Sequence, residues 1–258
     1  MAGWLGFLRL LYRLPWFALH VLLGTPLTVL CQASLFKSIP IRDRSLGEVT
    51  LTWWSRMVCR IFGLERQVRG SIVPGPLLVA ANHISWIDIP LVHSVAAIGF
   101  VAKAEIEEWP VIGWLGHLGE TVYHRRGSHD SASGVVTVMT ERLAAGGRVA
   151  IFPEGGILPG KGVKRFHARM FGAAINSGVP VQAVMLRYSR GGARYDDITF
   201  RPNEHFLGNF LRLMMQPRCT AEIEFLPPLP AAGKQRRQLA EEAETAVSTA
   251  YEAELPRG

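Results

Sequence analysis

The stretch Leu77-Leu78-Val79-Ala80-Ala81-Asn82-His83-Ile84-Ser85-Trp86-Ile87-Asp88 decides how the fold and the chemistry of this chain are interpreted. Its first five residues are apolar and predict a buried strand, and a turn into a helix follows them. His83 stands five positions before Asp88. At a strand-to-helix turn, such a carboxylate can fix the tautomer of the imidazole and stabilise the imidazolium that forms when the histidine takes a proton.

A structural interpretation also fits this stretch. Ser85-Trp86-Ile87-Asp88 matches the S-x-x-D/E capping box, in which the acidic residue bonds the backbone at the start of a helix. In that case Asp88 only caps a helix, and His83 is an ordinary hydrogen-bonded histidine. Short motifs have many chance matches, so the stretch alone does not choose between the two interpretations.

Three more segments follow, each beside a predicted strand. They are Thr121-Val122-Tyr123-His124-Arg125-Arg126-Gly127, Phe152-Pro153-Glu154-Gly155-Gly156 and Val179-Pro180-Val181-Gln182-Ala183-Val184. In order and spacing, the four segments resemble the sequence blocks of the glycerolipid acyltransferases. This is the family of the 1-acyl-glycerol-3-phosphate acyltransferases, which carries N-H-x-x-x-x-D and F-P-E-G blocks. The resemblance covers roughly residues 50–226, and four blocks in register are far more specific than one.

The resemblance implies roles for particular residues. His83 is the general base that removes a proton from the acceptor hydroxyl, and Asp88 orients and charges it. Arg126, or Arg125 beside it, helps to bind a glycerol phosphate together with Glu154, and an arginine fork suits phosphate. Structural alternatives are a solvated surface pair for the arginines and a carboxylate that bonds loop amides for the glutamate.

Four further residues complete the predicted substrate-binding group. Asn82 and Ser85 belong to the first block, and Gly155 and Gly156 belong to the F-P-E-G block. Backbone amides of a glycine-rich turn or a helix start can donate to the oxyanion that forms when a thioester carbon becomes tetrahedral. The two glycines are therefore candidates for this donor role.

One departure from the family pattern bears on the acceptor. The family usually continues F-P-E-G with Thr and then often Arg, whereas this chain continues with Gly156-Ile157. The nearby positive charges are Lys161, Lys164 and Arg165. They can replace the missing cation, or the acceptor is a different lyso-lipid such as lyso-ornithine lipid. Residues 166–171 and 186–188 also look like the bacterial branch that acylates lyso-ornithine lipid.

Composition limits the other function classes. The chain has 258 residues and a formal net charge of +7, which suits an anionic lipid, a nucleic acid or an acidic substrate. No zinc finger, RNP-like pattern or helix-turn-helix signature is present, so nucleic acid ranks below membrane. The three cysteines are scattered and predict neither a disulfide framework nor a metal cluster. A serine hydrolase is disfavoured by the absence of a G-x-S-x-G elbow, and the histidines show no metal-ligand spacing.

The N-terminal run points to a membrane. Residues 14–36 contain no Asp, Glu, Lys or Arg, and roughly 20 apolar residues are enough to cross a bilayer core. Basic residues on both sides leave the orientation open. The run either spans the bilayer or breaks at Gly24 and Pro26 into two half-helices that dip in from one face. A buried hairpin of a soluble protein is the structural alternative.

The remaining pattern predicts an α/β fold with a central mixed sheet flanked by helices, preceded by a hydrophobic membrane-associated helix or helical hairpin. The expected strands are residues 77–81, 99–102, 121–124, 149–152, 179–186, 197–200 and 221–225. The expected helices are residues 53–62, 87–95, 111–118, 131–145, 166–177 and 234–254. We divide the chain into an N-terminal membrane segment (1–48), an acyltransferase domain (49–230) and a polar C-terminal helix (231–258).

Together these observations predict a membrane-bound O-acyltransferase that transfers an acyl group from acyl-CoA or acyl carrier protein to a lyso-lipid hydroxyl. The first expected acceptor is 1-acyl-glycerol-3-phosphate, and the alternative is lyso-ornithine lipid. No cofactor, metal or nucleic acid is expected, and the expected location is the bacterial inner membrane with the active site facing the cytoplasm. A non-catalytic membrane-binding module is the alternative of another class, and the intact His83–Asp88 pair speaks against it.

Overall fold

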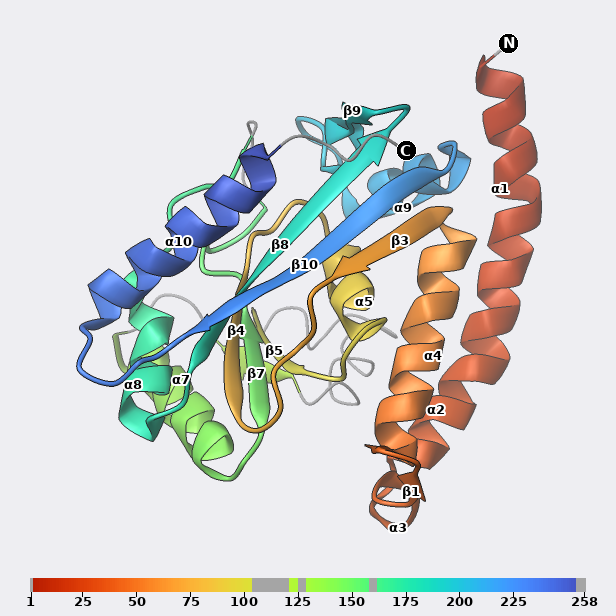
Figure 1. Ribbon diagram of the computed structural model, residues 1–258. Helices are drawn as coiled ribbons and strands as arrows, with labels where there is room; N and C mark the ends of the chain where they lie inside the picture. Colours follow the sequence, from red (N-terminus) through yellow and green to blue (C-terminus); the bar gives the residue numbers. More distant parts are fainter. Residues whose placement is uncertain (1, 104–120, 125–128, 158–161, 254–258) are drawn as a thin grey trace.

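The structure is a computed structural model that describes residues 2–103, 121–124, 129–157 and 162–253 (Figure 1). Within these residues, eight strands form one sheet in the order β3-β10-β8-β4-β7-β5-β6, with β9 paired to β8. The strands are β3 Leu64–Arg69, β4 Leu77–Ala81, β5 Gly99–Lys103, β6 Val122–His124, β7 Arg148–Ile151, β8 Val181–Arg190, β9 Ala193–Arg194 and β10 Cys219–Leu229. Strand β10 runs antiparallel to β8 and parallel to β3, so the sheet is mixed.

Helices cover both faces of this sheet (Figure 1). The helices are α1 Ala2–Leu19, α2 Thr25–Gln32, α3 Ser34–Lys37, α4 Leu46–Ile61, α5 Asp88–His93, α7 His129–Ala144, α8 Gly172–Ser177, α9 Phe206–Met215 and α10 Arg236–Glu252. One core lies between the sheet and α4, α5 and α9, and the other lies between the sheet and α7, α8 and α10. A small hairpin of β1 (Pro40–Ile41) and β2 (Arg44–Ser45) precedes α4.

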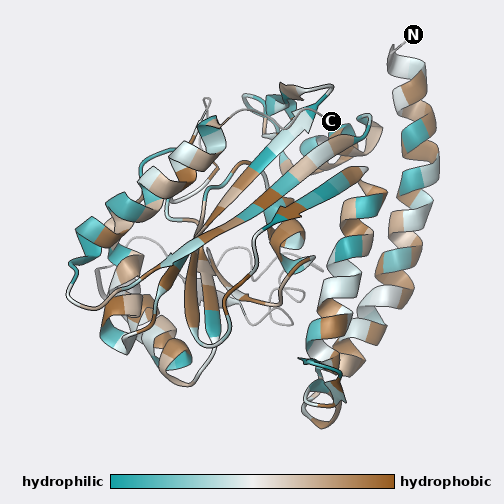
Figure 2. Cartoon of the chain, in the orientation of Figure 1, coloured by the Kyte–Doolittle hydropathy of each residue, from teal (hydrophilic) through white to brown (hydrophobic). Residues whose placement is uncertain are grey.

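Strand β4 shows how the sequence produces this three-layer arrangement. Its five residues are all buried, and side chains alternate between the two faces of a strand. Leu77, Val79 and Ala81 belong to the core beneath α4 and α5, whereas Leu78 and Ala80 belong to the core beneath α7 and α10. Figure 2 shows the middle of the sheet as hydrophobic. The strand therefore ends at a rigid point from which the following loop projects.

The predicted α/β fold with a mixed central sheet is confirmed, and six of the expected strands lie within a few residues of observed ones. The expected strand at residues 197–200 is wrong. A 3₁₀ helix, Asp196–Ile198, occupies this segment. Its polar–apolar alternation resembles a strand, but side chains bond its carbonyls: Ser85 donates to Ile198 O, and Asn209 donates to Thr199 O. The expected helix at residues 111–118 lies outside the described residues.

The N-terminal helix continues through Gly24 and Pro26 instead of breaking there. A π-helical turn, His20–Gly24, joins α1 to α2, and this irregularity accommodates the proline at the start of α2. By length and composition, Gly3–Gln32 is the one helical stretch among the described residues that is able to cross a membrane. Only 28% of its most apolar window is buried. Figure 2 shows hydrophobic residues recurring along this helix.

Helix α4 begins earlier than residue 53, where a helix was expected. Ser45 and Glu48 form a capping box: the Ser45 hydroxyl accepts from the Glu48 amide, and the Glu48 carboxylate accepts from the Ser45 amide. This pair starts the helix at Leu46, and α4 then packs against α2 and α5. The N-terminal helix is therefore held along the α/β domain rather than projecting from it (Figure 1).

Candidate active site

The Asp88 carboxylate lies at the centre of the first sequence block and is fully buried. Its Oδ2 lies 2.9 Å from His83 Nδ1 and accepts the backbone amides of Ile84 at 2.7 Å and Ser85 at 2.9 Å. Its Oδ1 accepts the hydroxyl of Tyr188 at 2.6 Å. Four donors thus surround one carboxylate.

Asp88 meets both descriptions that the sequence left open. It accepts the Ser85 amide in the turn that precedes α5, as the acidic residue of a capping box does, and with the same oxygen it holds the imidazole of His83. The Ser85 hydroxyl takes no part in a capping box, because it donates to Ile198 O at 3.0 Å. The geometry therefore gives a single carboxylate two kinds of partner, the backbone of the turn and the imidazole of His83.

The imidazole of His83 is placed between a carboxylate and an aromatic wall. Its side chain is 12% exposed, and its ring stacks on Phe152 with 3.9 Å between centroids and 9° between planes. With a proton on Nδ1 directed at Asp88, the other ring nitrogen, Nε2, carries a lone pair. A partly exposed imidazole in this tautomer is able to take a proton from a bound hydroxyl.

His93, at the other end of α5, provides a contrast. Its Nε2 lies 2.8 Å from Ile98 O, and burial lowers its pKa to about 4. It therefore stays neutral at physiological pH and serves as a core histidine. Among the described residues, no group of three or more His, Cys, Asp or Glu side chains is placed to hold a metal ion.

Asn82 binds the neighbouring strand through both ends of its amide. Its Nδ2 donates to Leu186 O at 2.9 Å, and its Oδ1 accepts from Leu186 N at 2.8 Å. The side chain is buried and extends the pairing of β4 with β8 by one residue. In this position Asn82 fixes the start of the loop that carries His83.

Glu154, in the F-P-E-G block, is buried and accepts two backbone amides. Its Oε2 accepts from His83 N at 3.2 Å, and its Oε1 accepts from Lys164 N at 2.9 Å. Burial raises the pKa of this carboxyl, and the two amide bonds oppose that effect. The structural alternative, a carboxylate that bonds loop amides, is the arrangement present here. Glu154 thereby ties the His83 loop to the loop after β7.

The glycines after Glu154 differ from each other. Both have positive φ, 82° for Gly155 and 154° for Gly156, which favours glycine at these positions. The Gly155 amide donates to Phe152 O at 3.1 Å and is therefore engaged inside the turn. Gly156 remains the better of the two candidates for an oxyanion donor. Arg125, Arg126 and Lys161 lie outside the described residues.

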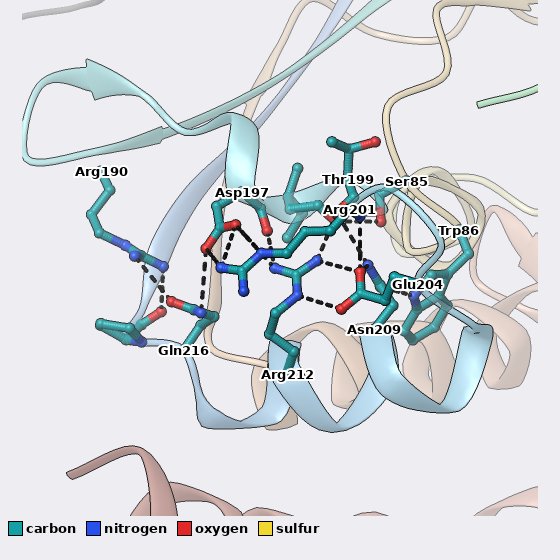
Figure 3. Close-up of polar contacts among 12 residues, drawn as sticks. Ser85, Trp86, Arg190, Asp197, Thr199, Arg201, Glu204, Asn209, Arg212 and Gln216 are labelled. Atoms are coloured by element: carbon teal, nitrogen blue, oxygen red, sulfur yellow. Dashed lines mark hydrogen bonds and ion pairs between the residues drawn. The ribbon is translucent and has the colours of Figure 1, made fainter. Parts of the chain in front are cut away.

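A second polar network holds the far side of the His83 loop (Figure 3). The Trp86 indole donates to Asn209 Oδ1 at 2.9 Å, and Asn209 Nδ2 donates to Glu204 at 2.9 Å. Glu204 pairs with Arg212 at 2.6 Å, which lowers the pKa of the Glu204 carboxyl to about 2. Helix α9 and the turn before it therefore form a framework behind Ser85 and Trp86.

Sequence reasoning missed two polar residues of this site, Tyr188 and Asn209. Asn209 interrupts the apolar helix Phe206–Met215, which is a signal in the sequence. Tyr188 lies between Arg187 and Ser189 in the buried part of β8 and carries no comparable signal. Both side chains are buried, at 2% and 0% exposure. A buried polar residue needs a partner, but a single sequence does not say which residue that partner is.

Comparison with known proteins agrees with this geometry. The acyltransferase family model matches residues 65–187. The chain is 36% identical to a lyso-ornithine lipid O-acyltransferase of Pseudomonas aeruginosa, with 94% of this chain and 93% of the relative covered. It is 35% identical to a 1-acyl-sn-glycerol-3-phosphate acyltransferase of Neisseria gonorrhoeae, over 64% of each chain.

A solved structure shares the whole fold. The crystal structure of the 1-acyl-sn-glycerophosphate acyltransferase PlsC from Thermotoga maritima superimposes with a TM-score of 0.72 and 21% identity, and the match covers 100% of both chains. The chain belongs to the acyltransferase family, and it is an acyltransferase of the lysophospholipid type. The resemblance stated from the four sequence blocks is thereby confirmed.

Proposed function

We propose that this enzyme transfers an acyl group from a thioester to the free hydroxyl of a lyso-lipid, with His83 as general base and Asp88 as its partner. The observation that carries the proposal is the 2.9 Å contact between His83 Nδ1 and Asp88, which leaves Nε2 of a partly exposed imidazole available to a substrate. General base catalysis of this kind typically contributes about 10²–10⁴-fold to the rate.

The reaction follows from this placement. His83 Nε2 removes the proton of the acceptor hydroxyl while the hydroxyl oxygen attacks the carbonyl carbon of the thioester. The charge that develops on the carbonyl oxygen needs backbone donors, for which the Gly156 amide is the candidate. When the C–S bond breaks, the imidazolium returns its proton to the leaving thiolate. Asp88 stabilises the imidazolium throughout, and no acyl-enzyme intermediate is required.

For the acceptor, we propose lyso-ornithine lipid first and 1-acyl-glycerol-3-phosphate second. The relative from Pseudomonas aeruginosa, which is similar over nearly the whole chain, carries the former name. Gly156-Ile157 also lacks the hydroxyl and the cation that the phosphate-binding family places after F-P-E-G. The second acceptor is favoured by Arg125-Arg126 in the second block, because paired arginines suit a phosphate monoester.

We further propose that the enzyme works on a membrane surface, with the exposed face of the N-terminal helix in the lipid. Large apolar side chains on this helix are exposed, and contiguous apolar surface of this kind marks a membrane or partner site. They include Trp4, Leu8, Leu11, Trp16, Leu22, Leu23 and Leu30. The opposite face is fixed to the domain, since Arg13 is buried and donates to Met214 O and Gln216 O.

Acyl transfer by the detergent-purified enzyme tests the proposal. Lyso-ornithine lipid and 1-acyl-glycerol-3-phosphate serve as acceptors, each with acyl-CoA and with acyl carrier protein, and mass spectrometry identifies the products. His83→Ala is the inactive variant. His205→Ala is the matched control, because it removes an exposed histidine whose side chain does not cap α9.

We expect diacylated product with lyso-ornithine lipid. His83→Ala lowers the rate of its formation by about 10²–10⁴-fold, and His205→Ala retains the wild-type rate. A higher kcat/KM for 1-acyl-glycerol-3-phosphate instead assigns the enzyme to the second acceptor and leaves the chemistry intact. Equal activity of wild type and His83→Ala contradicts the proposed chemistry. The same experiment identifies the preferred acyl donor, which is the one that supports turnover at the lower concentration.

A further inference from the structure

We propose that Tyr188 is a positioning residue that sets the proton affinity of the His83–Asp88 pair. It acts through the Asp88 carboxylate, to which it donates a hydrogen bond from the opposite side of the site. This inference rests on the proposed role of His83 as general base. It adds a third residue to the pair, from a strand that none of the four sequence blocks assigns to catalysis.

The geometry of Tyr188 singles it out. Its ring belongs to the core between the sheet and α5, and its hydroxyl reaches Asp88 Oδ1 at 2.6 Å. Charged O–H···O⁻ bonds fall at about 2.5–2.7 Å and are roughly twice as strong as neutral ones. The other oxygen, Oδ2, serves His83 and two backbone amides. Within the described part of the chain, Tyr188 is the partner found for Oδ1.

The phenol keeps its proton under all working conditions. Burial raises the pKa of Tyr188 well above its ordinary value, and the charge of Asp88 raises it further. Tyr188 is therefore a permanent donor rather than a second base. Its bond to Asp88 withdraws part of the charge that Asp88 otherwise offers to His83.

The other groups near the pair leave Asp88 as the main charge that Tyr188 contacts. Cys59 of α4 and Cys219 of β10 lie close enough to influence Tyr188, but burial raises their pKa values to about 12 and 11, so both thiols are neutral. Glu154, from the loop after β7, interacts electrostatically with both His83 and Asp88. It bonds the His83 backbone rather than its ring.

The direction of the effect follows from competition between two donors. Without the Tyr188 hydroxyl, the negative charge of Asp88 is shared with fewer donors, so the carboxylate binds the imidazolium of His83 more strongly. The protonated imidazole then persists to higher pH. Because only the neutral imidazole acts as a base, loss of this hydroxyl moves the acidic limb of the pH–rate profile to higher pH.

The test compares two variants in which a buried tyrosine loses its phenol hydroxyl. Tyr188→Phe removes the bond to Asp88. Tyr251→Phe is the matched control. Tyr251 belongs to α10 and is buried, and the guanidinium of Arg194 lies over its ring. No hydrogen bond of its hydroxyl is found among the described residues. Acyl transfer is measured from pH 5 to 9 with saturating acceptor. The NMR signal of the His83 imidazole, assigned by its loss in His83→Ala, is followed over the same range.

We expect the acidic limb of Tyr188→Phe to lie about one pH unit higher than in wild type. The rate is then about tenfold lower on the acidic side and nearly normal at high pH. Tyr251→Phe keeps the wild-type profile. A loss that is equal at every pH, an unchanged limb, or the same shift in Tyr251→Phe overturns the inference.

The imidazole signal separates this inference from the proposed function. If wild type shows no acyl transfer, the chemistry assigned above fails, yet the pH at which the His83 signal changes still reports on Tyr188. A shift of that signal to higher pH in Tyr188→Phe supports the inference independently of activity. An unchanged signal overturns it, even if Tyr188→Phe is a slower enzyme.

Discussion

Arg187 and Tyr188 are neighbours on β8, point to opposite faces of the sheet, and each bonds a buried carboxylate. Tyr188 donates to Asp88, which also holds His83. Arg187 makes a two-point contact with Glu222 of β10, with Nη2 at 2.8 Å and Nε at 3.3 Å. Its Nη1 donates to Tyr251 O and Ala253 O at the end of α10.

The two carboxylates differ in whether one of their partners is able to exchange a proton with a substrate. Around Glu222 the described partners are arginines, which neutralise its charge inside the fold. One of them, Arg187, also bonds the end of α10 and so holds this helix against the sheet. Around Asp88 one partner is an imidazole that is 12% exposed and free to exchange a proton. The first arrangement stabilises structure, whereas the second suits the proposed proton transfer.

The largest expected effect is on activity. His83→Ala removes the base and reduces acyl transfer by about 10²–10⁴-fold, while the thermal unfolding temperature stays near that of wild type. Initial rates and differential scanning fluorimetry on the same preparation measure both quantities. A large drop in unfolding temperature together with the activity loss places His83 with the structural residues instead.

Arg187→Met is expected to show the opposite pattern. Loss of the buried partner leaves Glu222 with the partly exposed Arg69, at 3.6 Å, as its remaining described partner, and it lowers the free energy of unfolding by about 3–5 kcal/mol. The fraction that remains folded keeps its kcat. Chemical denaturation gives the free energy, and the double variant Arg187→Met/Glu222→Leu recovers part of the loss because it also removes the buried charge of Glu222.

A buried histidine without a carboxylate sharpens the comparison. Burial lowers the pKa of His93 to about 4. Between this pH and about 6.5, the histidine is therefore protonated in the unfolded chain and neutral in the folded chain. The stability that this histidine supports is present above pH 6.5 and declines by about 3 kcal/mol as the pH falls toward 4. His93→Gln, which keeps a donor for Ile98 O, shows a smaller decline in denaturation series across this window.

The smallest expected effect concerns the support behind the loop. Trp86→Phe keeps the aromatic packing but removes the donor to Asn209, which costs about 1–2 kcal/mol of stability and slows transfer a few-fold. Trp16→Phe, at an indole that is 61% exposed, is the matched control and leaves the free energy of unfolding unchanged in detergent. Equal effects of the two substitutions would contradict a supporting role of the Trp86–Asn209 hydrogen bond.

The sequence predicts well what depends on local pattern. The apolar run of Leu77–Ala81 is observed as β4 without a change of bounds, because a fully buried strand has an unmistakable composition. Edge strand β3, Leu64–Arg69, was missed since its exposed position leaves it mostly polar. Helix α9 was also missed, although Phe206, Phe210 and Leu213 have helical spacing.

The site divides in the same way. His83 and Asp88 are five positions apart, so the chain itself brings them together, and their contact was predicted. Tyr188 is 100 positions from Asp88, and Glu222 is 35 from Arg187. Contacts across such separations depend on strand order, which a single sequence does not reveal. For this reason Tyr188 was unassigned until β4 and β8 were placed side by side.

The most direct test replaces each buried carboxylate by its amide. Asp88→Asn and Glu222→Gln preserve shape and remove charge, and acyl transfer and thermal unfolding are measured for both variants with the same lyso-lipid. We expect Asp88→Asn to lose about 10²–10³-fold of activity while it remains folded. We expect Glu222→Gln to unfold at a lower temperature while its folded fraction keeps the wild-type rate. Wild-type turnover by folded Asp88→Asn would contradict the assignment of this carboxylate to the chemistry.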